Sequence, residues 1–164
     1  MSRLHWIATR TLTRCPGRLA IMARPRAEDW LEADLDAWKS AGVDQVVSLL
    51  EREEVSELGL QAEPDMCREK GIVFLSFPIP DRGVPDIREA RHLAETLARD
   101  IASGRSVAIH CRAGIGRSSL IAACALICSG GDAHEALQLI KDARGVSVPD
   151  TEEQRDWVLA FNRT

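Results

Sequence analysis

The sequence predicts an α/β fold in which a central, mostly parallel twisted sheet is flanked by helices on both faces. Two observations predict it. Short apolar segments rich in β-branched residues alternate along the chain with longer segments of helical periodicity. These strand-like segments are apolar throughout, which is typical of parallel strands that are buried on both faces.

The first half of the chain contains three predicted strands and three predicted helices. The helix over 28–41 carries Leu31, Leu35 and Trp38 on one face and acidic residues on the other, and Gly42 ends it. A later helix begins near Pro64, a residue typical of first helical positions, and Gly71 closes it. In chain order these elements are a strand at 18–23, a helix at 28–41, a strand at 43–50, a helix at 51–58, a helix at 64–70 and a strand at 72–79.

The second half begins with a loop over 78–85, which contains three prolines and one glycine. Asp86 and Glu89 form an Asp-x-x-Glu capping signal before a helix that runs to Ile101. Asp150 and Glu153 give the same signal for the final helix. The remaining elements are a strand at 106–110, a loop at 111–117 and helices at 118–129, 132–144 and 150–161.

Length and charge narrow the class of protein. A chain of 164 residues fits a single domain over 1–164, in which we expect residues 1–16 to form an irregular arm. The net charge of −4 argues against binding to nucleic acid through bulk charge. The longest apolar run, 120–128, is too short to span a membrane, and the N-terminus lacks a signal-peptide pattern. We therefore expect a cytoplasmic protein.

The five cysteines do not indicate a disulfide framework, because their number is odd and their spacing shows no pairing pattern. No CxxC is present and the histidines do not cluster, so we expect no metal and no cofactor. Cys124 and Cys128 lie four residues apart on an apolar helix and are expected in the core. Cys67 is a redox partner for the loop cysteine only if the fold brings the two together. Three tryptophans are expected in the core: Trp30, Trp38 and Trp157.

The N-terminal region is rich in arginine before the first acid, Glu28. This pattern fits either a solvated surface arm or a rim that binds a partner or substrate. The arginines concerned are Arg3, Arg10, Arg14, Arg18, Arg24 and Arg26.

The segment 106–119 carries the chemistry. Gly114 and Gly116 let the loop curl so that backbone N–H groups point inward and form an anion-binding nest. The loop ends at a helix N-terminus, which adds free N–H groups, and Arg117 offers a planar, two-pronged donor. Cys111 at the base of this cup lies in positive potential, which favours the thiolate. The pattern predicts a phosphate-shaped cup with a nucleophile at its floor.

His110-Cys111-Arg-Ala-Gly-Ile-Gly-Arg-Ser118 resembles the signature loop of the cysteine-dependent protein tyrosine phosphatases, above all their dual-specificity branch. Phe77-Pro-Ile-Pro-Asp-Arg-Gly-Val-Pro-Asp86 resembles the general-acid loop of the compact members, such as the cyclin-dependent-kinase-associated phosphatases and the small archaeal and bacterial enzymes. The resemblance covers about residues 17–161 and implies the same α/β fold.

The resemblance also implies roles. Cys111 would attack phosphorus to form a phosphocysteine, and Arg117 would bind the phosphate oxygens. Asp81 would be the general acid, Ser118 would assist departure of the sulfur, and His110 would brace the loop. Phosphate-binding backbone would come from Arg112, Ala113, Gly114, Ile115 and Gly116.

Other readings stay open at several positions. Asp86 is a rival general acid, although its pattern fits a helix cap. Arg82 and Arg112 either contact substrate or are simply solvated. Asp150 stands where tyrosine phosphatases often carry a glutamine that orients the hydrolytic water, and Gln154 is a substitute candidate.

The expected substrate is a phosphoprotein or phosphopeptide, with phosphotyrosine first and phosphoserine or phosphothreonine next. The loop should also bind free phosphate, sulfate or vanadate. The same chemistry on a phosphoinositide, an inositol phosphate or an RNA 5′-phosphate is an alternative, weakened by the uncharged Ala113 and Ile115, where lipid-specific members tend to carry lysine. A phosphate-binding module without catalysis is a further alternative, weakened because both Cys111 and Asp81 are present. Rhodanese-type and arsenate-reductase-type cysteine enzymes also use an anion cup, but they lack an Asp loop of this form.

Overall fold

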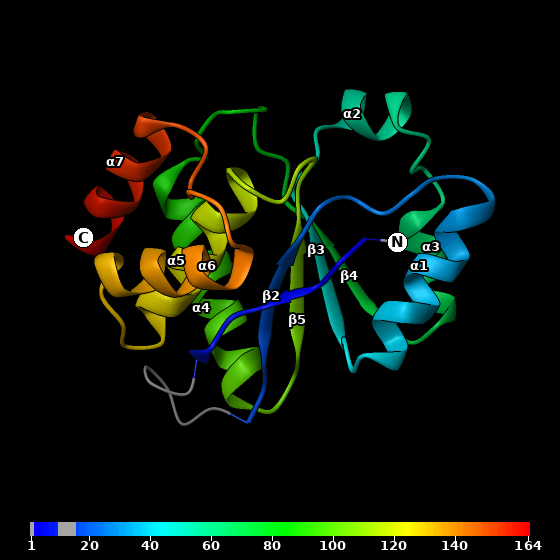
Figure 1. Ribbon diagram of the computed structural model, residues 1–164, viewed down its shortest axis with the longest axis horizontal. Coiled ribbons are helices and arrows are strands. Elements are labelled where there is room, and N and C mark those ends of the chain that lie inside the picture. Colours follow the sequence, from blue (N-terminus) through cyan, green and yellow to red (C-terminus); the bar gives the residue numbers. More distant parts are fainter. Residues whose placement is uncertain (1, 10–15) are drawn as a thin grey trace.

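The structure, a computed structural model, describes residues 2–9 and 16–164. In that part of the chain a five-stranded sheet has the strand order β1-β2-β5-β3-β4 (Figure 1). Strands β2, β5, β3 and β4 are parallel, whereas β1 is antiparallel to β2. The predicted mostly parallel sheet is thereby confirmed. The strands are β1 (His5–Trp6), β2 (Leu19–Met22), β3 (Gln45–Ser48), β4 (Val73–Ser76) and β5 (Val107–His110).

The prediction that residues 1–16 form an irregular arm is wrong for residues 5–6. His5 pairs with Ile21 and Trp6 with Ala20, and the guanidinium of Arg18 lies 3.9 Å from the centre of the Trp6 ring. A two-residue strand is too short to show any periodicity, so its sequence gave no signal. Residues Arg10, Arg14 and Cys15 lie outside the described residues.

Side chains of successive residues in each strand pack on opposite faces of the sheet. In β2, Leu19 and Ile21 join one hydrophobic cluster, whereas Ala20 and Met22 join the other. All four are fully buried. Both faces of the sheet therefore need a covering layer of helices, as a parallel sheet requires.

Within the described residues, four helices cover the first face, on the left in Figure 1. The central one, α5, is apolar on nearly all sides, and residues 117–126 of it are buried. A helix of this kind is stable only between other elements, and α4, α6 and α7 surround it. Their bounds are α4 (Ile87–Ala102), α5 (Arg117–Cys128), α6 (Ala133–Arg144) and α7 (Glu152–Asn162).

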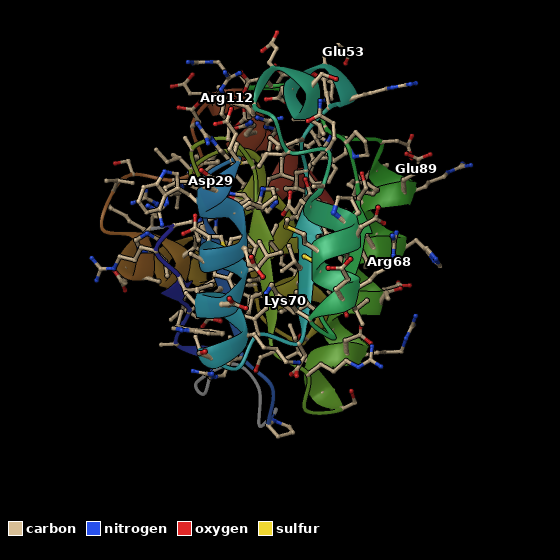
Figure 2. The ribbon with its side chains drawn as sticks, turned by 90° about the vertical axis from the view of Figure 1, so that its right-hand side faces the viewer. Asp29, Glu53, Arg68, Lys70, Glu89 and Arg112 are labelled. Atoms are coloured by element: carbon tan, nitrogen blue, oxygen red, sulfur yellow. The ribbon has the colours of Figure 1, made fainter. Side chains whose placement is uncertain are left out.

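The opposite face is covered by α1 (Asp29–Ser40) and α3 (Glu63–Glu69), with α2 (Arg52–Glu57) at one end of the sheet. Figure 2 shows α1 and α3 side by side. The Lys70 ammonium, just after α3, lies 2.5 Å from Asp36 and 3.4 Å from Glu32 of α1. Such surface pairs add little stability, so the buried side chains between the helices hold this layer.

The tryptophans differ in their surroundings. Trp38 is fully buried and Trp157 is half-buried, but Trp30 is 59 % exposed, so the prediction that it lies in the core is wrong. Trp30 lies one residue before Leu31 and therefore points away from the buried face of α1, which includes Leu31 and Leu35. The guanidinium of Arg26 covers its ring at 4.6 Å.

The carboxyl ends of β2, β3, β4 and β5 share one edge of the sheet, because these strands are parallel. Figure 1 places α2 and the green loop before α4 at that edge, and Figure 2 shows Arg112 and Glu53 of α2 at the same end of the molecule. Ligands bind at this edge in open α/β sheets. No helix in the described ranges is both long and apolar enough to cross a membrane.

Candidate active site

Cys111 is the first residue after β5 and is 2 % exposed. The Gly114 N–H donates to its Sγ at 3.3 Å, and Ser118 Oγ lies 3.3 Å from the same sulfur. The loop from 111 to 116 thus wraps around the sulfur and then enters α5 at Arg117. The Gly114 N–H donates to the sulfur, and the Ser118 hydroxyl is able to do so.

The two loop glycines are required by space. Gly114 has φ +71°, and a Cβ on it would lie 2.5 Å from the Met22 carbonyl carbon. A Cβ on Gly116 would lie 2.8 Å from Gln154 Oε1 and 2.9 Å from Asp150 Cβ. The loop is therefore packed between β2 on one side and the start of α7 on the other.

Arg144, the last residue of α6, also supports the loop. Its Nε donates to the Gly114 carbonyl at 3.1 Å, and its Nη2 lies 3.4 Å from the Ala113 carbonyl. These bonds draw the carbonyl groups outward. In the same two peptide planes, the Gly114 N–H faces the Cys111 sulfur, and the Ile115 N–H can face an anion.

Arg117 is buried, and its guanidinium contacts α2 and the loop between β4 and α4. Both of its terminal nitrogens donate to the Glu54 carboxylate of α2, at 2.7 and 2.8 Å. Its Nη1 donates to the Ile79 carbonyl at 3.0 Å, and its Nη2 lies 3.1 Å from Asp81 Oδ1. The guanidinium plane is fixed in place by these contacts before any ligand arrives.

The pKa values of this pair follow from the same contacts. Burial by itself would raise the pKa of Glu54. The hydrogen bonds from Arg117 and the Glu51 N–H, together with the charges of Arg117 and Arg112, outweigh burial and hold this pKa below its usual range. Burial would lower the pKa of Arg117, but the bonds to Glu54 and the nearby Cys111 and Asp81 raise it. Both groups are therefore charged near neutral pH. Sequence reasoning missed Glu54, because it is one of several acids in a short polar helix.

Asp81 lies in the loop between β4 and α4, where its side chain is 53 % exposed. A tight turn holds this loop, because the Gly83 N–H donates to the Pro80 carbonyl at 2.8 Å. The Asp81 carboxylate lines the same cavity as Cys111. Asp86, the rival acid, instead accepts hydrogen bonds from the N–H groups of Arg88 and Glu89 at the start of α4. It is a helix cap, as its pattern indicated.

The start of α7 differs from the sequence expectation. Thr151, not Asp150, is the N-cap residue, and its hydroxyl accepts from the Gln154 N–H at 3.1 Å. The Gln154 side-chain oxygen accepts from the N–H groups of Asp150 and Thr151, while its Nε2 donates to the Gly83 carbonyl at 3.1 Å. Gln154 is fully buried. It therefore clamps the loop of Asp81 to α7.

A cavity of about 220 Å³ brings most of the predicted site residues together. Arg82 and Arg112 lie at its exposed rim; Arg82 is 3.8 Å from Asp150, and Arg112 is 3.9 Å from Glu57. Asp150 is free of a capping role and faces this cavity. The lining residues are Asp81, Arg82, Cys111, Arg112, Ala113, Ile115, Gly116, Arg117, Asp150 and Gln154.

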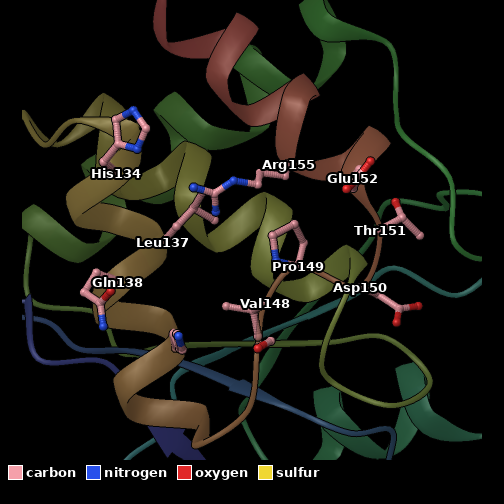
Figure 3. Close-up of a pocket in the computed structure, with 11 residues that line it drawn as sticks. His134, Leu137, Gln138, Val148, Pro149, Asp150, Thr151, Glu152 and Arg155 are labelled. Carbon is pink, nitrogen blue, oxygen red and sulfur yellow. The ribbon is translucent and has the colours of Figure 1, made fainter.

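A second cavity of about 490 Å³ adjoins the first (Figure 3). Asp150 belongs to the walls of both cavities. Leu137 and Val148 give the second cavity an apolar floor, and Lys141 and Arg155 are exposed at its edge. An extended ligand bound at Cys111 has room to continue past Asp150 in this direction.

His110 lies behind the loop and is fully buried. Its Nε2 is 2.7 Å from Glu63 Oε1, and its Nδ1 is 3.3 Å from the Cys111 carbonyl oxygen. Glu63 begins α3 and is 2 % exposed. Sequence reasoning missed Glu63, which lies one residue before the helix start predicted at Pro64.

The other described cysteines lie apart from this cavity. Cys67 belongs to the hydrophobic cluster on the opposite face of the sheet from Cys111. Burial, with the nearby Glu63, raises the pKa of Cys67 to about 12. Cys124 is fully buried within α5 and Cys128 is half-buried, and burial raises the pKa of both. These thiols stay protonated at neutral pH, which makes them poor nucleophiles.

Comparison with known proteins gives consistent matches. Residues 10–137 match the family model described as cyclin-dependent kinase inhibitor 3. The rat protein of that name is 32 % identical over 133 residues, which are 80 % of this chain and 63 % of the rat protein. The chain thus spans less than two thirds of the length of these curated relatives.

Two solved structures are also similar. One is kinase associated phosphatase with its catalytic-site cysteine replaced by serine; it has a TM-score of 0.90 and 25 % identity, over 99 % of this chain and 94 % of that chain. The other is Tk-PTP in its active form, with a TM-score of 0.75 and 28 % identity, over 90 % of this chain and 92 % of that chain. The sheet and its flanking helices are thus shared with known phosphatases.

Proposed function

Since the chain belongs to the cyclin-dependent kinase inhibitor 3 family, we propose that it is a dual-specificity protein phosphatase that works through a phosphocysteine intermediate. The observation that supports this proposal most directly is that Cys111, Arg117 and Asp81 meet at one small cavity. Cys111 and Arg117 come from the loop after β5 and the start of α5, and Asp81 comes from the loop between β4 and α4. A thiol, a fixed guanidinium and a carboxylate in this arrangement suit nucleophilic transfer of a phosphoryl group.

In the first step, the Cys111 thiolate attacks phosphorus and an S–P bond forms. The bond between phosphorus and the leaving oxygen breaks, and Asp81 in its acid form donates a proton to that oxygen. Arg117 and the N–H groups of the loop bind the three remaining phosphate oxygens. Because these donors are already fixed, little reorganisation is needed as charge develops.

In the second step, water attacks the phosphocysteine and the S–P bond breaks, which releases phosphate. Asp81, now a carboxylate, accepts a proton from that water. Ser118 donates to the departing sulfur from its position 3.3 Å away. Positive charge in both steps comes from Arg117 and the backbone, so this mechanism needs no metal or cofactor.

The substrate class we propose is a phosphoprotein segment, with phosphotyrosine favoured and phosphoserine or phosphothreonine accepted. The side chains of Arg82 and Arg112 are 67 % and 47 % exposed at the rim, where they can contact acidic residues next to the phosphate. Phosphate, sulfate and vanadate should occupy the cup. We also propose a cytoplasmic location, because the four described cysteines are free thiols.

The alternative substrates are less favoured. A phosphoinositide or inositol phosphate carries several anionic groups, yet loop residues Ala113 and Ile115 are uncharged, and Asp150 adds negative charge to the cavity wall. An RNA 5′-phosphate does not suit the net charge of −4. A binding module would not need the Asp81 carboxylate beside the phosphate site.

The test is phosphate release in the presence of EDTA from a phosphotyrosine peptide, a phosphothreonine peptide and a soluble phosphoinositide. Wild type and Cys111→Ser are compared. We expect release from the peptides by wild type only, with vanadate binding retained in the variant. Release by Cys111→Ser, or release from the phosphoinositide alone, would contradict the proposal.

A further inference from the structure

The cavity of about 490 Å³ beside the active site has no use in the mechanism above (Figure 3). It lies between α6, the loop over 147–149 and the start of α7, and it shares Asp150 with the cavity that contains Cys111. Its floor is apolar, because Leu137 and Val148 are 3 % and 7 % exposed. A ligand seated at Cys111 can therefore extend into a second cavity that is already formed.

Two cationic side chains from different helices line this second cavity. Lys141 belongs to α6 and Arg155 to α7, and both residues are exposed. Among the described residues, no carboxylate forms an ion pair with either of them. The arginines of the first cavity differ, since Arg82, Arg112 and Arg117 are each paired with a carboxylate. Lys141 and Arg155 are therefore free to pair with a charge on a ligand.

Asp150 and Glu152 also line the second cavity, but their charges lie on its other side. In Figure 3 both carboxylates lie to the right of Pro149, whereas the Arg155 guanidinium lies to its left. Asp150 is also 3.8 Å from Arg82, which balances part of its charge before any ligand binds. An apolar floor excludes part of the solvent, so a cation above it attracts an anion more strongly than in open water. The Arg155 side of the cavity therefore favours an anionic group.

We propose that Lys141 and Arg155 form a specificity subsite for an anionic side chain of the phosphoprotein segment whose phosphoryl group lies at Cys111. The anion is the carboxylate of an aspartate or glutamate, or a second phosphoryl group, because both present oxygen acceptors to the two cations. The subsite selects among segments and touches no reacting atom. This inference rests on the proposed function, since it requires a phosphoprotein segment in the first cavity.

The test measures the affinity of fluorescent phosphotyrosine peptides for the Cys111→Ser variant, so it requires no turnover. In a peptide of otherwise uncharged residues, one glutamate is moved through about four positions on either side of the phosphotyrosine, the reach of an extended chain. We expect glutamate at one or two of these positions to tighten binding about fivefold relative to glutamine, as two partly exposed ion pairs would. The gain should shrink at high salt. Phosphoserine at the same position distinguishes the two kinds of anion, since the preferred one gives the larger gain.

Lys141→Gln/Arg155→Gln, combined with Cys111→Ser, removes both charges and should abolish the gain. Arg88→Gln/Arg163→Gln removes two exposed charges outside both cavities and is the matched control, in which the gain should persist. A gain that persists without Lys141 and Arg155 would place the anion elsewhere and overturn the proposal. Equal affinities for glutamine, glutamate and phosphoserine at every position would also overturn it.

These outcomes are separate from those of the proposed function. Turnover by wild type tests the reaction, whereas the affinities test only the subsite. Rapid turnover of peptides whose affinity does not depend on their flanking charges would reject the subsite alone. A gain from glutamate without any turnover by wild type would reject the reaction and keep the subsite.

Discussion

Arg117 and Glu54 form two hydrogen bonds, of 2.7 and 2.8 Å, between the two ends of the guanidinium and the two carboxylate oxygens. Both side chains are buried, and they come from α5 and α2. A bidentate pair of this kind fixes the guanidinium plane. Glu54 therefore sets the orientation in which Arg117 meets a phosphate group.

We expect Glu54→Gln to lower kcat/KM for an aryl phosphate by about tenfold to a hundredfold, because a small misplacement of a catalytic group is costly. The guanidinium would keep its charge but lose its fixed plane. Steady-state kinetics with vanadate inhibition measure this effect. Glu57→Gln, an exposed change at the end of the same helix, is the matched control and should resemble wild type. Equal kinetics for Glu54→Gln and wild type would refute the role of Glu54.

Glu54 should also contribute to the acid sensitivity of the fold. Burial raises the pKa of Glu54, but the contacts with Arg117 contribute to a folded-state pKa that lies below the unfolded value. The unfolded chain therefore binds the proton more readily. The stabilisation is therefore complete above the ordinary glutamate pKa and is lost as pH falls through the lower folded value. The free energy of unfolding, measured with urea between neutral and acidic pH, should fall less steeply in Glu54→Gln than in wild type. A loss as steep as in wild type would contradict this.

Glu54→Gln should also be less stable at neutral pH, by about 3 kcal/mol, because Arg117 would lose its charged partner while remaining buried. Kinetic assays of this variant are therefore run well below its unfolding temperature.

Asp81→Asn removes the proposed acid and keeps the shape of the side chain. We expect kcat for a phosphoester with a poor leaving group to fall about a hundredfold or more, with a smaller effect on a good leaving group. A series of aryl phosphates measures this dependence. Asp86→Asn is the control from the same loop, because asparagine caps a helix as well as aspartate does. If Asp81→Asn slows every ester in the series equally, Asp81 is not the acid.

Gln154→Ala should release the acid loop from α7, because it removes the bond to the Gly83 carbonyl. We expect kcat to fall about tenfold, mainly for poor leaving groups, since the loop would spend less time with Asp81 in position. Gln138→Ala, an exposed change on α6 whose amide contacts Asp142, is the control. A fall in kcat that does not depend on the leaving group would show that Gln154 acts on something other than Asp81.

Gly114→Ala tests the packing of the loop. Gly114 and Gly145 have similar φ values, +71° and +78°, but a Cβ on Gly145 meets nothing within 4 Å. Gly145→Ala should therefore cost only the backbone strain, about 1–2 kcal/mol. Gly114→Ala should cost more and should abolish vanadate binding. Equal unfolding free energies for the two variants would contradict the proposed clash with β2.

The sequence predicted the parts of the site that lie close together in the chain. The strand, the loop over 111–117 and the helix after it are local, and so is the proline-rich loop with Asp81. The start of α7 was misassigned by one residue, because Asp150-x-x-Glu153 and Thr151-x-x-Gln154 overlap and both are capping patterns. Only the packing of Gln154 against Gly83 and Gly116 selects the second pattern.

The buried acids could not be predicted in the same way. Glu54 lies in a helix with several other acids, and Glu63 lies just before a proline, so neither stands out locally. Their partners, Arg117 and His110, are 63 and 47 residues away in the chain. A carboxylate is buried only where the tertiary fold brings it a donor, and that information is not present in a local window.

The most direct test of the account is to trap the intermediate. The protein is mixed with a rapidly hydrolysed aryl phosphate, quenched in acid within the first turnover and analysed by peptide mass spectrometry. The account predicts the mass of one phosphoryl group on the peptide that contains Cys111, absent in Cys111→Ser. Rapid phosphate release with no phosphoryl group on that peptide, or with the group on another residue, would contradict it.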